Sequence, residues 1–150
     1  MNETLTALEY YNLIRGRIEH ENNLIMQRLS WLVASQSFLF TAYAIALNGL
    51  AVPALPASVQ GYVRQQIDVF HLVPVVGILT CALIYVSILA AFGAMREMRR
   101  LYRTRVHAEQ AGLPDVQSSA STQFFGAAAP VWLPLVFIAV WLFLLVRGMQ

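Results

Sequence analysis

Between Leu72 and Ala94 the chain reads LVPVVGILTCALIYVSILAAFGA, a run that contains no Asp, Glu, Lys or Arg. A bilayer core about 30 Å thick is crossed by roughly 20 apolar helical residues, because each residue adds about 1.5 Å. A core helix of a small soluble bundle keeps a charged face, which this run lacks. The run therefore predicts a helix that spans a membrane.

Two more tracts free of charged residues extend from Leu29 to Val63 and from Val116 to Val146. Over all 150 residues, 58% are hydrophobic and 12% are charged, whereas soluble domains carry about a quarter charged residues. We predict an all-α integral membrane protein with three transmembrane helices, at residues 29–52, 72–94 and 124–147. The alternative is two spans with a re-entrant or peripheral third segment, because Pro130 and Pro134 interrupt the third tract and its helix can begin near Pro130.

The segments outside the spans have their own patterns. Residues 1–28 place apolar side chains at helical intervals, which predicts an amphipathic cytoplasmic helix. No breaker separates it from the first span, so one rod to about Val52 is expected, with Gly16 or the pair Asn22-Asn23 as the places to bend. Residues 53–71 are expected to be an outer loop with an interfacial helix, 95–112 a basic cytoplasmic extension of the second span, and 113–123 a polar linker.

The arginines predict the orientation of the chain. All ten basic residues are Arg, and eight of them lie either before the first span or directly after the second. Basic residues favour the cytoplasmic side, so the N-terminus is expected inside and, after three spans, the C-terminus outside. Residues 1–28 contain no apolar stretch typical of a signal peptide, so the first span is expected to be an uncleaved anchor.

The first span carries a stripe of small and polar residues, which we call the polar stripe. Its members recur at alternating steps of four and three: Ser30, Ala34, Ser37, Thr41, Ala44, Asn48 and Ala51. The same spacing continues back to Gln27, Asn23 and His20. Lipid cannot satisfy polar groups, so this face is expected to contact protein or water. It either packs against another helix or lines a pore formed by several copies of the chain.

Two larger side chains inside the spans also need neighbours. Gln36 lies off the polar stripe and requires another helix to satisfy its amide. Trp141 lies deeper than the other aromatic residues near the predicted membrane boundaries and is expected to pack against a neighbour.

The extension of the second span carries a basic face, formed by Arg96, Arg99, Arg100, Arg103 and His107. Such a face typically binds anionic lipid headgroups. Two alternatives remain open. One is ion pairing with Glu9, Glu19 and Glu21 in the same or another subunit, and the other is binding of a soluble anion or a nucleotide-like ligand.

No pattern in the chain indicates catalysis. There is no phosphate-binding glycine loop, no pair of acids inside a span and no ionisable residue at mid-membrane depth. Cys81 is the single cysteine, and His20 cannot share one ion with its neighbours Glu19 and Glu21 unless another chain contributes. We expect no enzymatic activity, no metal site, no cofactor and no nucleic-acid partner.

The stretch 21–40 contains Asn23, then Arg28-Leu29, Trp31-Leu32 and Ser35-Gln36. This pattern resembles the N-terminal part of small uncharacterised bacterial multi-span membrane proteins, and it is loosely similar to the SLATT class of conflict-system effectors, which are proposed to form pores. The third span departs from a two-span effector plan. The resemblance implies that Asn23, Arg28, Trp31 and Gln36 position the first helix at the cytoplasmic boundary.

The sequence thus predicts a multi-pass protein of the bacterial inner (cytoplasmic) membrane, with a periplasmic C-terminus. Our hypothesis is a homo-oligomer, surrounded by membrane lipids, that forms an ion-permeable pore lined by the polar stripe. The alternative hypothesis is a membrane scaffold or accessory subunit that docks a cytoplasmic protein partner through its helical extensions.

Overall fold

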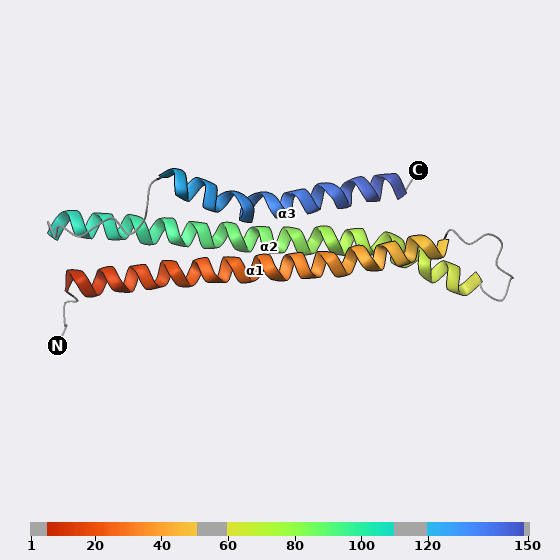
Figure 1. Ribbon diagram of the computed structural model, residues 1–150, viewed down its shortest axis with the longest axis horizontal. Helices are drawn as coiled ribbons and strands as arrows, with labels where there is room; N and C mark the ends of the chain where they lie inside the picture. The colour runs from red at the N-terminus through yellow and green to blue at the C-terminus, as the bar shows by residue number, and fades with distance from the viewer. Residues whose placement is uncertain (1–5, 51–59, 110–119, 149–150) are drawn as a thin grey trace. The chain divides into compact units, whose positions relative to one another are not determined.

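The computed structural model describes residues 6–50, 60–109 and 120–148, which form three α-helices and no strand (Figure 1). They are α1 (Ala7–Leu50), α2 (Gln60–Glu109) and α3 (Ala120–Gly148). Each contains a stretch long and apolar enough to cross a membrane, so the prediction of an all-α protein with three membrane-spanning helices is confirmed. Ala51 of the polar stripe, residues 53–59 of the outer loop and residues 113–119 of the linker lie outside the described residues.

Helix α1 is a single helix of 44 residues that continues through Gly16 and the pair Asn22-Asn23. Thr6 and Glu9 close its first turn with reciprocal hydrogen bonds. The Glu9 carboxylate accepts from the Thr6 backbone N–H (2.9 Å) and hydroxyl (2.8 Å), and the Thr6 hydroxyl oxygen accepts from the Glu9 N–H (3.4 Å). Such a capping box satisfies N–H groups that have no partner inside the helix.

Helix α2 is longer than the sequence suggested. It begins at Gln60 and runs for 50 residues, so residues 60–71 are its first turns and not a separate interfacial helix. Pro74 lies inside the helix and is fully buried. A proline removes one backbone hydrogen bond, a loss that neighbouring helices make tolerable in membrane helices.

Helix α3 begins at Ala120, before Pro130, so residues 120–123 belong to the helix and not to the linker. Pro130 and Pro134 are both buried. Their packing against protein offsets the backbone hydrogen bonds that the two rings remove, which explains why neither proline ends the helix.

The chain divides into two compact units. Unit 1 contains residues up to Arg28 and the segment from Val86 to Val131. Here α1 and α2 run antiparallel. Tyr10, near the start of α1, stacks on Tyr102, near the end of α2 (ring centroids 6.4 Å apart), whereas Arg28, later in α1, contacts Ser87, earlier in α2. Buried apolar residues fill the space between the two helices: Ile14, Ile18, Ile25, Ile88, Ala91 and Met95.

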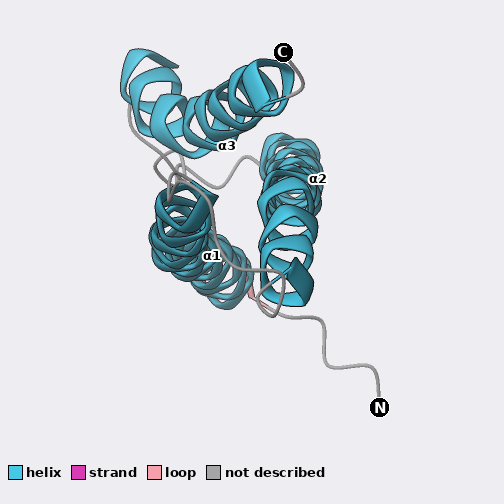
Figure 2. Cartoon of the chain, turned by 90° about the vertical axis from the view of Figure 1, so that its right-hand side faces the viewer, coloured by secondary structure: helices cyan, strands magenta, loops and turns pink. Residues whose placement is uncertain are grey.

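Unit 2 contains residues 29–85 and 132–150, and in its described part the three helices pack side by side (Figure 2). Tyr43 of α1 stacks on Phe70 of α2 at 4.8 Å, and Trp141 of α3 is fully buried against both helices. The indole lies over Gly77 of α2, where an added Cβ would come within 2.6 Å of Trp141 Cε2. Only glycine leaves room for the indole at this position.

We therefore expect Gly77→Ala to lower the free energy of unfolding by about 1–3 kcal/mol, because the new methyl group displaces a buried indole. Gly93→Ala is the matched control on the same helix, since a Cβ at Gly93 meets nothing within 4 Å. SDS titration in mixed micelles measures the unfolding free energy of both variants. Equal stabilities of the two variants would contradict the close contact between Gly77 and Trp141.

Candidate functional site on the outward face of the first helix

A buried hydrogen bond in unit 2 determines which side of α1 faces the rest of the chain. Trp141 Nε1 donates to Gln36 Oε1 at 2.6 Å, and neither side chain is exposed. Phe40, one turn after Gln36, stacks on the same indole with ring centroids 4.3 Å apart. Trp141 thus satisfies the buried carbonyl oxygen of Gln36, while the Gln36 Nε2 group is buried without a hydrogen-bond partner among the described residues. Gln36 and Phe40 are the neighbours that the indole was expected to have.

The same side of α1 carries the other buried residues of unit 2. Leu32, Tyr43 and Ala46 are buried together with Gln36. These positions recur at steps of three, four or seven, as expected when one helical face packs against neighbouring helices. The opposite face of α1 therefore points away from the other described helices of unit 2 and is exposed.

The polar stripe lies on that outward face. All of its described members are exposed: Ser30, Ala34, Ser37, Thr41, Ala44 and Asn48. These described members of the stripe are therefore not buried against α2 or α3 of the same chain. What remains is packing against another chain or contact with water.

Two hydroxyl groups of the stripe bond to their own helix. Ser37 Oγ donates to the Val33 carbonyl at 2.8 Å, and Thr41 Oγ1 donates to the Ser37 carbonyl at 2.9 Å. These bonds satisfy the hydroxyl protons, which makes the helix tolerable in a membrane. The hydroxyl oxygens keep acceptor capacity that points away from the chain.

Asn48 differs from the two hydroxyl residues. Its exposed amide makes no hydrogen bond within the described part of the chain. An amide has two N–H donors and a carbonyl acceptor, and leaving such a group unbonded in hydrocarbon costs free energy. Asn48 thus requires water, a headgroup or another chain beside it.

The other two helices expose a different kind of surface. On α2 between Leu72 and Ala94 and on α3 between Ala129 and Val146, no fully exposed residue is polar. The polar side chains in those stretches of α2 are all partly buried, as Thr80 and Ser87 illustrate. Lipid is a favourable environment for these exposed apolar surfaces of α2 and α3. In the described spans, only α1 exposes polar groups that lipid cannot hydrogen-bond.

A row of large apolar side chains borders the polar stripe. Trp31, Phe38 and Ile45 follow one another at seven-residue steps and are 75%, 74% and 65% exposed. Seven residues are close to two turns of a helix, so the three side chains lie on one line. The outward face of α1 therefore combines a polar line with an apolar edge.

The residues expected to position the first helix do not form one group. Asn23 and Trp31 are exposed, whereas Gln36 is buried against α3. Arg28 is half-buried in unit 1, where its Nη1 donates to the backbone carbonyl of Ser87 at 3.3 Å. Arg28 thus links α1 to α2, and Gln36 links α1 to α3.

The basic face belongs to α2 within unit 1. Arg96, Arg100 and Arg103 are exposed and Arg99 is half-buried, while the side chain of His107 lies outside the described residues. Burial, followed by repulsion from Arg103 and Arg96, lowers the pKa of Arg99 from its ordinary value. Cations that repel one another in this way attract an anion or an anionic surface.

Two of the three acidic residues of α1 bond to residues of the same helix end or helix face. Glu19 accepts from Arg15 Nε at 3.0 Å, and Glu9 accepts from Thr6. On α2, Glu97 lies 3.9 Å from Arg100, a loose pair between exposed side chains. Exposed pairs of this kind contribute little to stability.

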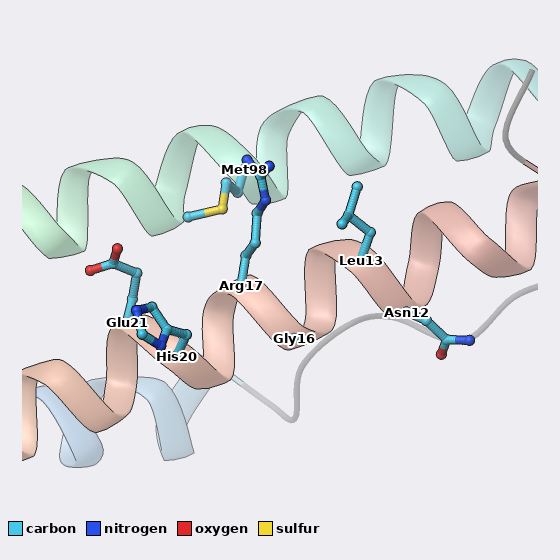
Figure 3. A pocket seen from close by; sticks show the side chains of 7 residues that line it. All are labelled: Asn12, Leu13, Gly16, Arg17, His20, Glu21 and Met98. Atoms are coloured by element: carbon cyan, nitrogen blue, oxygen red, sulfur yellow. The ribbon is translucent and has the colours of Figure 1, made fainter.

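Unit 1 also has an open groove of about 550 Å³ between α1 and α2, shown in Figure 3. Arg17 and Leu13 point from α1 towards α2, and Met98 points back from α2. The remaining lining residues are Asn12, Gly16, His20 and Glu21. In the described residues no group of three or more His, Cys, Asp or Glu side chains is placed to hold a metal ion.

Sequence reasoning identified the polar stripe but not the contacts that orient it. The bond between Gln36 and Trp141 joins residues 105 positions apart, and no local pattern pairs them. The capping box could have been predicted from the sequence, since Thr6 and Glu9 have the three-residue spacing of that motif. The bond from Arg28 to the Ser87 carbonyl involves a backbone atom and leaves no trace in the sequence.

Comparison with known proteins gives no relative: no family model matches the chain, and neither a curated protein nor a solved structure does.

The pairing of Gln36 with Trp141 leads to a double-mutant prediction. Trp141→Phe removes the donor and leaves the Gln36 carbonyl buried without a partner, so we expect a loss of about 1–3 kcal/mol in unfolding free energy. Adding Gln36→Leu removes the stranded amide, and the two losses should be less than additive by at least 0.5 kcal/mol, as expected for residues in contact. SDS titrations of the wild type, both single variants and the double variant measure this coupling. Strict additivity would mean that the hydrogen bond does not form.

Proposed function

We propose that this protein forms an ion-permeable pore from several copies of the chain, lined by the polar stripe of α1. The observation that carries the proposal is the contrast between exposed surfaces. The exposed positions between Leu72 and Ala94 of α2 and between Ala129 and Val146 of α3 are apolar, whereas α1 exposes Ser30, Ser37, Thr41 and Asn48. A polar face directed away from its own chain inside a membrane favours water or other copies as its environment.

An assembly is needed because three spans do not readily enclose a water-filled path. In a closed ring each copy would place α2 and α3 against lipid and turn the outward face of α1 towards the axis. Trp31, Phe38 and Ile45 at the edge of the stripe would then pack between neighbouring copies. Their exposed apolar surface supports contacts of this kind.

The chemistry of the lining favours passive conduction. Hydroxyl oxygens at Ser37 and Thr41 and the amide at Asn48 can stabilise hydrated ions without binding them tightly. The lining would be neutral, because the stripe contains no charged residue within the span. Selectivity would therefore depend on pore width more than on the sign of the ion.

The membrane and the orientation are part of the proposal. The arginine distribution favours a cytoplasmic N-terminus, and the resemblance of residues 21–40 to bacterial membrane proteins favours the inner membrane. Unit 1 would then place the basic face of α2 at the cytoplasmic side, near anionic headgroups.

A second candidate function is a membrane scaffold that docks a cytoplasmic protein. The observation that favours it is the combination, within unit 1, of exposed Arg96, Arg100 and Arg103 with the groove between α1 and α2. An acidic segment of a partner would suit this surface. In that case the polar stripe would serve only to hold copies of the chain together.

Conductance across a planar bilayer tests the leading proposal. We expect purified wild-type protein to conduct, and Thr41→Leu or Asn48→Leu to change the unitary conductance several-fold, because each replaces a polar group on the axis by a larger apolar one. Leu83→Ile is the matched control, since Leu83 is exposed on the apolar face of α2.

A folded oligomer that never conducts would overturn the pore proposal and favour the scaffold. Conductance that responds equally to Thr41→Leu and to Leu83→Ile would refute the assignment of the lining to α1.

A further inference from the structure

The guanidinium group of Arg28 has more hydrogen-bonding capacity than its surroundings in the chain use. A guanidinium offers five N–H donors, and one bond is formed here, from Nη1 to the Ser87 carbonyl at 3.3 Å. No carboxylate pairs with Arg28 in the described part of the chain. A half-buried cation without a counter-ion favours an anion from outside the described part of the chain as its partner.

The position of Ser87 on α2 gives the depth of this group. Arg96 is the next charged residue after Ser87 on α2, nine positions later. Nine helical residues correspond to about 13 Å along the helix axis. Between them the fully exposed residues of α2 are Leu89, Ala90, Gly93 and Ala94. Arg28 thus lies beside a part of α2 whose exposed surface is apolar, and it is the last charged residue of α1 before the uncharged tract that starts at Leu29. A cation at the edge of an apolar surface suits a lipid, which combines a phosphate with acyl chains, better than it suits a soluble anion.

We propose that Arg28 binds the phosphate of a phospholipid headgroup at the side of the α1–α2 pair in unit 1. The Ser87 carbonyl holds the guanidinium in place through one N–H, and the remaining N–H groups make no hydrogen bond to the described part of the chain. A guanidinium matches two phosphate oxygens with two parallel hydrogen bonds, which a lysine ammonium cannot do. The exposed apolar side chains of Val86 and Leu89 on α2 provide a surface for the upper part of the acyl chains.

This lipid site requires that the protein lies in a membrane but does not depend on pore formation. It also differs from the basic face of α2, whose arginines begin at Arg96. Removal of Arg28 should therefore release one bound lipid per chain and leave the binding of anionic membrane surfaces by α2 unchanged.

Native mass spectrometry of delipidated protein, titrated with phosphatidylglycerol, tests the site. We expect one tightly bound lipid per wild-type chain, an affinity about tenfold or more lower for Arg28→Gln, and an intermediate affinity for Arg28→Lys, because charge-assisted hydrogen bonds to the phosphate are lost or weakened. Arg15→Gln is the matched control, since Arg15 is exposed and pairs with Glu19.

A parallel titration with inorganic phosphate distinguishes a lipid headgroup from a free anion. The proposal predicts that inorganic phosphate at the same concentration does not displace the lipid. Displacement by phosphate, or equal lipid binding by wild type and Arg28→Gln, would overturn it. Circular dichroism and gel filtration identify any variant that is misfolded, and Arg28→Lys keeps the test decisive if Arg28→Gln does not fold.

Discussion

The buried hydrogen bond from Trp141 to Gln36 is the constraint on which the arrangement of unit 2 depends. In a membrane the hydrophobic effect does not drive helices together, so close packing and hydrogen bonds must do so. The indole satisfies both needs, because it fits against Gly77, stacks on Phe40 and donates to the Gln36 amide. Once Gln36 faces inward, helical geometry turns Ser37, Thr41 and Asn48 outward.

This orientation gives α1 two opposite faces of different chemistry. One is filled by the side chains of its own chain, and the other combines the polar stripe with the row formed by Trp31, Phe38 and Ile45. Helices α2 and α3 lack such a second face between Leu72 and Ala94 and between Ala129 and Val146, where their exposed residues are apolar. The three spans are thus chemically unequal, and α1 is the span suited to contacts beyond the chain.

Much of the fold follows from the sequence, because long uncharged tracts are a local property that length and composition identify. The polar stripe is also local, since its alternating steps place Ser30 to Asn48 on one face of any helix. Which way that face points is not local, since it depends on Trp141, far along the chain. The starts of α2 and α3 were the hardest features to predict. Both helices begin before a proline and continue through Pro74, Pro130 and Pro134, because each proline is buried against protein, which the sequence does not reveal.

Disulfide cross-linking between copies tests most directly the claim that the outward face of α1 is where copies of the chain meet. In native membranes, with the buried Cys81 replaced by alanine, a cysteine introduced at Thr41 should form a covalent dimer on oxidation, whereas one at Leu83 on the lipid-facing side of α2 should not. Cross-linking through position 83 but not through position 41 would contradict the account.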